Sequence, residues 1–127
     1  MSLKVGEIIS FERSFTRKDV EMFTKLSGDE GIHHLTPDEQ GRLVVQGLLT
    51  ATLPTKVGGA HNVLARTMTF EFARPVFTGD TIFCDVEIEQ YKRQPDNRTA
   101  ITAAFNCRNQ NGKRVLSGMF AGIILPD

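Results

Sequence analysis

Apolar and polar residues alternate along much of the second half of the chain, as in β-strands that bury one face. The alternation is clear over residues 82–88 and again over residues 101–107. Asn111-Gly112 is a strong hairpin signal, and residues 115–125 carry apolar side chains on both faces, as expected of a well-covered strand. The pattern therefore predicts three antiparallel strands over these segments.

A further long strand is predicted over residues 64–72, although Arg66 interrupts its alternation. Leu64 is expected to lie on the same face as three later apolar residues, Met68, Phe70 and Phe72. A short entry strand is expected between residues 5 and 15. The chain is thus expected to form four long strands, connected mostly by hairpins.

A helix is predicted to begin after Thr16, because Thr16 and Asp19 have the spacing of a capping box. Gly28 is expected to end this helix. Three apolar residues at three-residue spacing are expected to form its core-facing stripe: Val20, Phe23 and Leu26.

A second helix is predicted from Gly47 to Val57, and it should be buried on nearly every side. The segment contains one charged residue, Lys56, and Gly58-Gly59 supplies a stop signal. Pro54 predicts a bend or an early end. Because the helix needs a cover and the sheet has an apolar face, the sequence predicts an α+β fold. A curved antiparallel sheet would wrap around a buried central helix in one domain, residues 1–127.

Composition excludes several classes of function. The 127 residues hold 15 Lys and Arg against 15 Asp and Glu, so no basic excess indicates a nucleic acid or an anionic membrane as partner. The apolar runs are too short to span a bilayer, and the N-terminus lacks a signal-peptide pattern. Cys84 and Cys107 lie on apolar strand faces without metal-like spacing. We therefore expect buried free thiols in a cytoplasmic protein.

Candidate chemistry lies in residues 26–34, where Asp29 and His34 are expected on one irregular, solvated loop. A carboxylate and an imidazole can hold different protonation states near neutrality, so both could face one bound water in acid–base catalysis. The alternative is a simple turn, because Gly-Asp is a common turn signal and histidines in loops are mostly solvated.

Three motifs resemble those of the MaoC-like dehydratases, the family of (R)-specific enoyl-CoA hydratases, over roughly residues 16–126. The motifs are aromatic–Ser-Gly-Asp…His in residues 23–34, an apolar pair followed by x-Gly and small residues in 44–51, and Phe-x-Arg-Pro-Val-x-x-Gly-Asp in 72–80. Gly31-Ile32 replaces the family's Asn-Pro. The resemblance implies the hot-dog fold.

The resemblance also implies roles for five residues. Asp29 and His34 would be the catalytic pair, and the backbone N–H of Gly47 would bind the thioester carbonyl. Gln46 stands where the family has a His before that glycine, so it is expected to contact substrate. Thr55 falls where the family often has a Ser, although a helix hydroxyl that bonds its own backbone is the alternative.

The implied activity is metal-independent hydration of a trans-2-enoyl thioester to the (R)-3-hydroxyacyl thioester, or the reverse, as in fatty acid metabolism. No cofactor is expected beyond coenzyme A or acyl-carrier protein as the substrate's handle. A homodimer or a dimer of dimers is expected, because open sheet edges favour pairing with another chain. The alternatives are a non-catalytic acyl-thioester-binding protein and a hot-dog thioesterase. A thioesterase would usually carry a carboxylate on the buried helix, and residues 47–57 hold none.

Overall fold

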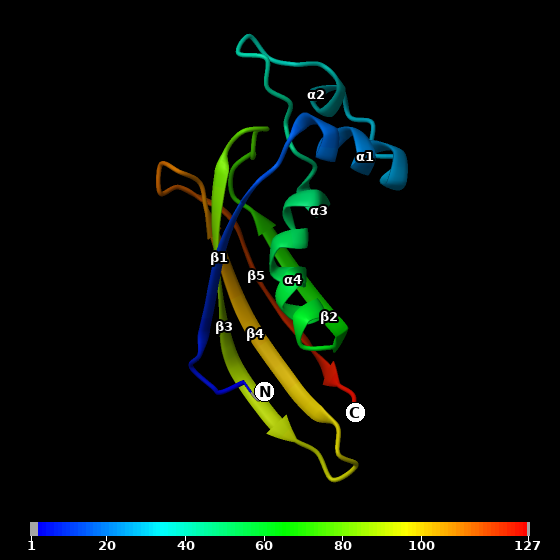
Figure 1. Cartoon of the computed structure of the whole chain (residues 1–127), viewed down its shortest axis with the longest axis vertical. Helices are drawn as coiled ribbons and strands as arrows, with labels where there is room; N and C mark the ends of the chain where they lie inside the picture. Colours follow the sequence, from blue (N-terminus) through cyan, green and yellow to red (C-terminus); the bar gives the residue numbers. More distant parts are fainter. Residues whose placement is uncertain (1–2, 127) are drawn as a thin grey trace.

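The computed structural model describes residues 3–126, so residues 1, 2 and 127 of the expected domain lie outside the described part. Five antiparallel strands form one sheet in the order β1-β3-β4-β5-β2, which places β1 and β2 at its edges. The helices lie on one side and at one end of the sheet (Figure 1). The elements are β1 (Ile8–Ser14), α1 (Arg17–Ser27), α2 (Ile32–Leu35), α3 (Gly47–Thr50), α4 (Thr52–Ala60), β2 (Val63–Phe72), β3 (Thr81–Arg93), β4 (Thr99–Arg108) and β5 (Arg114–Ile124).

The two central strands β3 and β4 bury the face that the sequence predicts. Their inward side chains alternate with exposed or half-buried ones along both strands. Cys84 on β3 lies directly opposite Cys107 on β4. Both are buried free thiols, as expected from their places on apolar strand faces. The side-chain contact with Cys107, together with burial, raises the pKa of Cys84. Its thiol is therefore an inert part of the core rather than a nucleophile.

Strand β2 corrects one prediction, because Leu64 is exposed whereas Met68 and Phe70 pack against the core. The register of β2 against β5 shifts between Ala65 and Thr67, so Arg66 occupies a β-bulge. A bulge adds one residue to one strand, and side chains before it move to the other face. The break in alternation at Arg66 in the sequence therefore marks the β-bulge.

Helix α1 begins as predicted and orients its apolar residues differently. Thr16 and Asp19 form both hydrogen bonds of the capping box, and Gly28 ends the helix in the left-handed conformation. Val20 is buried, but Leu26 is 83% exposed, so its placement in the core was wrong. At 3.6 residues per turn, each three-residue step falls about 60° short of a full turn. Leu26 is therefore rotated by about 120° from Val20, away from the core.

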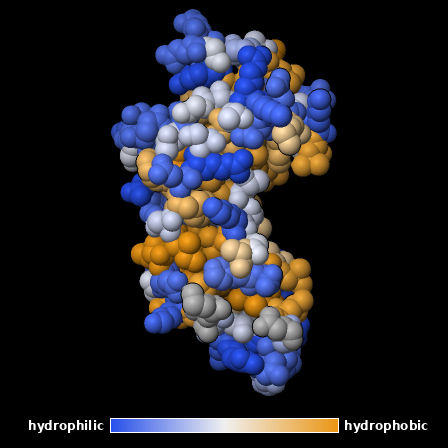
Figure 2. Space-filling model, in the orientation of Figure 1, coloured by the Kyte–Doolittle hydropathy of each residue, from blue (hydrophilic) through white to orange (hydrophobic). Residues whose placement is uncertain are grey.

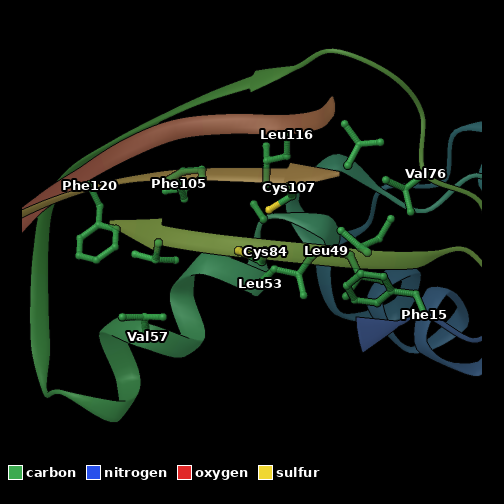
Figure 3. Close-up of a cluster of buried hydrophobic side chains, with 14 of the residues drawn as sticks. Phe15, Leu49, Leu53, Val57, Val76, Cys84, Phe105, Cys107, Leu116 and Phe120 are labelled. Atoms are coloured by element: carbon green, nitrogen blue, oxygen red, sulfur yellow. The ribbon is translucent and has the colours of Figure 1, made fainter. Parts of the chain in front are cut away.

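The predicted central helix is divided into α3 and α4, which meet at Ala51. Pro54 lies in the first turn of α4 and has no N–H to donate to the carbonyl of Thr50, where α3 ends. The missing hydrogen bond accounts for an interruption of the helix at Ala51. One side of the helix pair packs on the sheet through Leu49, Leu53 and Val57, which point toward β3, β4 and β5 (Figure 3).

The other side of the helix pair is open, which corrects the prediction of burial all round. Leu48 is 60% exposed, and Thr55 and Lys56 are exposed as well. A single five-stranded sheet covers one side of a helix, and the sequence pattern does not distinguish cover by the same chain from cover by another. The space-filling view shows apolar surface near the end of α1, at the right of the molecule, and a hollow directly below it (Figure 2).

No helix within residues 3–126 combines the length and the apolar character that crossing a bilayer requires.

Candidate active site

Asp29 is held at the point where α1 ends. The N–H of Gly28 donates to the carbonyl of Thr24 at 2.9 Å, and the left-handed Gly28 turns the chain out of the helix. Ser27 then fixes Asp29. The Ser27 hydroxyl donates to the carbonyl of Phe23 and accepts the N–H of Asp29 at 3.0 Å. The carboxylate of Asp29 is thus placed by the helix end and remains about half exposed to solvent.

His34 lies on the short helix α2 and is only 6% exposed, so the expectation of a solvated loop histidine was wrong. Its ring Nδ1 lies 2.6 Å from the carbonyl oxygen of Val44. A carbonyl oxygen can only accept, so Nδ1 carries the proton and donates it. In the neutral ring, Nε2 is therefore left with its lone pair free.

The structure brings the free nitrogen of His34 to Asp29, with Nε2 and Oδ2 3.6 Å apart. This separation is too long for a direct hydrogen bond. A single substrate water beside both atoms can bond to each, so the pair can share or move one proton. The ring of His33 packs on that of His34, with centroids 3.9 Å apart, yet His33 itself is exposed.

Gly47 lies beside a hollow that also reaches His34. A hollow of about 270 Å³ is lined by both His34 and Gly47, together with Thr50 and Phe72. Within residues 3–126 the N–H of Gly47 donates to no protein acceptor, as expected at the first position of a helix. A Cβ at this position would meet the Phe72 ring at 3.0 Å, so only glycine leaves the ring in place.

The structure separates the other two candidates from this hollow. The Gln46 side chain is fully buried and directs its amide group toward α1, where Nε2 donates to Thr24 Oγ1 at 2.9 Å. The hydroxyl of Thr55 donates to the carbonyl of Thr52 in its own helix at 2.6 Å. Thr55 lines a different hollow, between α4 and β2.

Sequence reasoning missed one functional group, the carbonyl of Val44 that orients the imidazole. Any residue type supplies a backbone carbonyl, so no side-chain pattern could have identified it. The contact arises because the segment that leads to α3 returns beside α2, where the N–H of Val44 also donates to the carbonyl of His33 at 3.0 Å.

Among residues 3–126, no group of three or more His, Cys, Asp or Glu is placed to hold a metal ion.

A family model matches more than half of the chain. Residues 37–117 match the family model described as "FAS1-like, dehydratase domain region". The chain belongs to this family. The match begins after Asp29 and His34 and includes Gly47, so the two candidate acid–base residues lie outside the matched residues.

Two relatives are 3-hydroxyacyl-[acyl-carrier-protein] dehydratases with mitochondrial in their names. The tomato protein (FERN) is 27% identical, over 91% of this chain and 74% of its own length. The Arabidopsis thaliana protein is 26% identical, over 98% of this chain and 79% of its own length. The resemblance to dehydratases that the sequence motifs indicated is thus confirmed.

Solved structures with the same fold include an (R)-hydratase from A. caviae involved in PHA biosynthesis. It is 25% identical, with a TM-score of 0.83 and coverage of 98% of both chains. The unliganded R-hydratase PhaJ1 from Pseudomonas aeruginosa is also 25% identical, with a TM-score of 0.79 over 98% of this chain and 83% of its own. These similarities confirm the predicted α+β hot-dog fold.

Proposed function

We propose that this chain is a hydratase/dehydratase of acyl thioesters that interconverts trans-2-enoyl and (R)-3-hydroxyacyl forms. One observation carries the proposal. Asp29 Oδ2 and the free Nε2 of His34 lie 3.6 Å apart, and His34 shares a hollow with Gly47, whose N–H has no acceptor within residues 3–126. An acid–base pair for water and a donor for a carbonyl oxygen are the groups that this reaction needs.

In the hydration direction, Asp29 and His34 together take a proton from water as its oxygen bonds to the β-carbon. The electrons of the C=C bond move toward the thioester carbonyl, and the α-carbon then receives the proton. Elimination of water reverses these steps. Because both groups lie beside the same water, we assign the proton to the Asp29–His34 unit rather than to one of the two residues.

Gly47 supplies the electrostatic part of the mechanism. Its N–H would donate to the thioester carbonyl oxygen and stabilise the negative charge that develops there. A fixed backbone donor needs no rearrangement as charge develops. The absence of a side chain also lets the thioester approach the backbone closely.

The proposal also covers the carrier of the thioester, the oligomeric state and the cellular location. The thioester is carried by coenzyme A or by acyl-carrier protein, and the names of both plant relatives favour the latter. The reaction requires no metal ion or further cofactor. A single domain spans residues 1–127 and assembles as a homodimer or a dimer of dimers, and a cytoplasmic location stays a prediction.

Two other activities remain as competing hypotheses. In a thioesterase of this fold, a carboxylate on the central helix would activate water, and residues 47–60 hold none. A non-catalytic thioester-binding protein would need the hollow but not the acid–base pair. The closeness of Asp29 to His34 favours the hydratase.

The decisive experiment is an assay of purified protein with crotonyl thioesters of coenzyme A and of acyl-carrier protein. Hydration should remove the absorbance of the conjugated enoyl group, and chiral analysis should identify the (R)-3-hydroxy product. Pretreatment with EDTA should leave the rate unchanged. Tight thioester binding without turnover, across acyl lengths and both carriers, would favour the binding protein and contradict the proposal.

A further inference from the structure

Gln46 connects the two parts of the site that lie far apart in the sequence. It directly precedes Gly47, and its backbone carbonyl accepts the N–H of Thr50 at 3.0 Å in the first turn of α3. Its side-chain Nε2 donates to Thr24 Oγ1 at 2.9 Å and to the carbonyl of Val20 at 3.3 Å, both on α1. The start of the central helix is thereby tied to α1 through one side chain.

The same hydrogen bonds continue toward the catalytic carboxylate. The hydroxyl of Thr24 donates to the carbonyl of Val20 at 2.9 Å, so its oxygen is free to accept from Gln46. The carbonyl of Thr24 accepts the capping N–H of Gly28, and Asp29 follows. A continuous chain of contacts thus runs from Gly47 through Gln46 and Thr24 to Asp29.

Burying the amide of Gln46 costs stability that an apolar side chain of the same size would not cost. The side chain is 0% exposed, and Oε1 has no hydrogen-bond partner within the described residues. An apolar side chain of the same length would fill this volume without a buried unsatisfied oxygen. What the amide adds is direction, because its N–H donors require Thr24 and Val20 at fixed distances and angles.

We propose that Gln46 is a positioning residue that sets the distance between the Gly47 N–H and the Asp29–His34 pair. It acts through the backbone of Gly47 and through Thr24, and it does not touch the substrate, which replaces the contact role expected from the sequence. The inference rests on the proposed hydratase function. Placement matters because small errors in the position of reacting groups reduce catalysis strongly.

The test removes each end of this connection while volume is kept. Gln46→Met deletes the donors, and Thr24→Val deletes the hydroxyl that accepts them. Each variant should lower kcat about tenfold or more, with KM within about threefold of the parent. The double variant should be no slower than the slower single variant, because both substitutions break the same contact. Thr52→Val is the matched control: its hydroxyl donates to the carbonyl of Leu49 within the helix pair, so kcat should be unchanged.

Thermal unfolding separates positioning from a purely structural role. If Gln46 only supports the fold, Gln46→Met and Thr24→Val will lower Tm and keep the parental kcat well below Tm, which overturns the inference. Additive losses of kcat in the double variant would also overturn it. A parent protein without turnover would remove the proposed function and this inference together, whereas an active parent with active variants would remove only the inference.

Discussion

Asp29 and His34 form a unit in which each residue has a different structural setting. The carboxylate is half exposed at the end of α1, whereas the imidazole is buried and anchored by its Nδ1 to the carbonyl of Val44. This anchor fixes the tautomer and directs Nε2 at Asp29. Loss of either residue should therefore disable the same proton transfer.

Asp29→Asn and His34→Asn should each lower kcat by about a hundredfold or more. Asn at position 34 retains an N–H that can reach Val44, so it removes Nε2 without leaving the carbonyl unpaired. His34→Ala would instead leave that part-buried carbonyl without its partner and cost about 1–3 kcal/mol of stability. The loss of enoyl-thioester absorbance measures all variants.

The double variant of Asp29 and His34 should be little slower than the slower single variant, since residues that act as a unit are not additive. His61→Ala is a suitable control, because His61 follows the end of α4 and does not line the hollow of the site. Near-parental activity in both single variants would remove the pair from the mechanism.

Gly47 offers a separate test of the backbone donor. Proline is tolerated at the first position of a helix, and Gln46 before it is already extended, with φ −58° and ψ 142°. Gly47→Pro should therefore remove the N–H while helix α3 persists, and kcat should fall about a hundredfold. Gly47→Ala retains the N–H and adds only the contact with Phe72, so its loss should be clearly smaller. Equal losses in both variants would show that space, rather than the N–H, is what position 47 provides.

The helix pair α3 and α4 is the element that joins the core to the site. Its buried face packs on the sheet, and its first residue carries the proposed carbonyl donor. Helices α3 and α4 share Ala51, and the Thr52 hydroxyl donates to the carbonyl of Leu49, so the packing of α4 on the sheet also places α3.

Two leucines on this helix pair should differ strongly in their effect on stability. Leu53 is 2% exposed, so Leu53→Ala should lower the free energy of unfolding by about 2–5 kcal/mol. Leu48 lies on the open side, and Leu48→Ala should cost less than about 1 kcal/mol in the isolated chain. Urea unfolding at low protein concentration compares them, and similar losses for both would contradict the one-sided packing of the helix.

Strands β3 and β4 place their cysteines where reagents cannot reach them. The raised pKa of Cys84 favours the protonated thiol, and burial of both thiols excludes an alkylating reagent. In native buffer at pH 8, iodoacetamide should label neither residue, and both should be labelled in denaturant. Rapid labelling of native protein, read by mass spectrometry, would contradict this packing.

At the scale of the whole molecule, the sheet and the helix pair both present open surfaces. Strand β2 is an edge of the sheet, and two of its large apolar side chains, Leu64 and Phe72, are exposed. Sheet edges of this kind favour pairing with another chain. The hollowed side of the molecule in Figure 2 adds surface that a second copy can cover.

A homodimer at micromolar concentration is therefore expected in sedimentation equilibrium. Activity per chain should fall on dilution below the dissociation constant if the site needs the second copy for its shape. A stable monomer with full activity would contradict both the assembly and that dependence. Leu48→Lys should weaken the dimer, whereas the same change at the distant, exposed Val5 should have less effect.

The sequence alone determined those features that depend on neighbours along the chain. The alternation in β3 and β4, the capping box at Thr16 and the stop at Gly28 are local, and each is present as predicted. The interruption before Pro54 is local as well, because it depends on one missing N–H. Asp29 and His34 were selected through the motif that resembles a known family, and their closeness in sequence lets them meet at the end of α1.

Tertiary structure decided everything that depends on what packs against each element. The bulge at Arg66 exposed Leu64. Helix α1 packs through Val20, which leaves Leu26, about 120° away around the helix, exposed. His34 became buried because the segment through Val44 returns beside α2, and Gln46 turned toward α1 because Thr24 faces it there. Periodicity reports the period of a helix or strand, but which face is covered depends on partners distant in sequence.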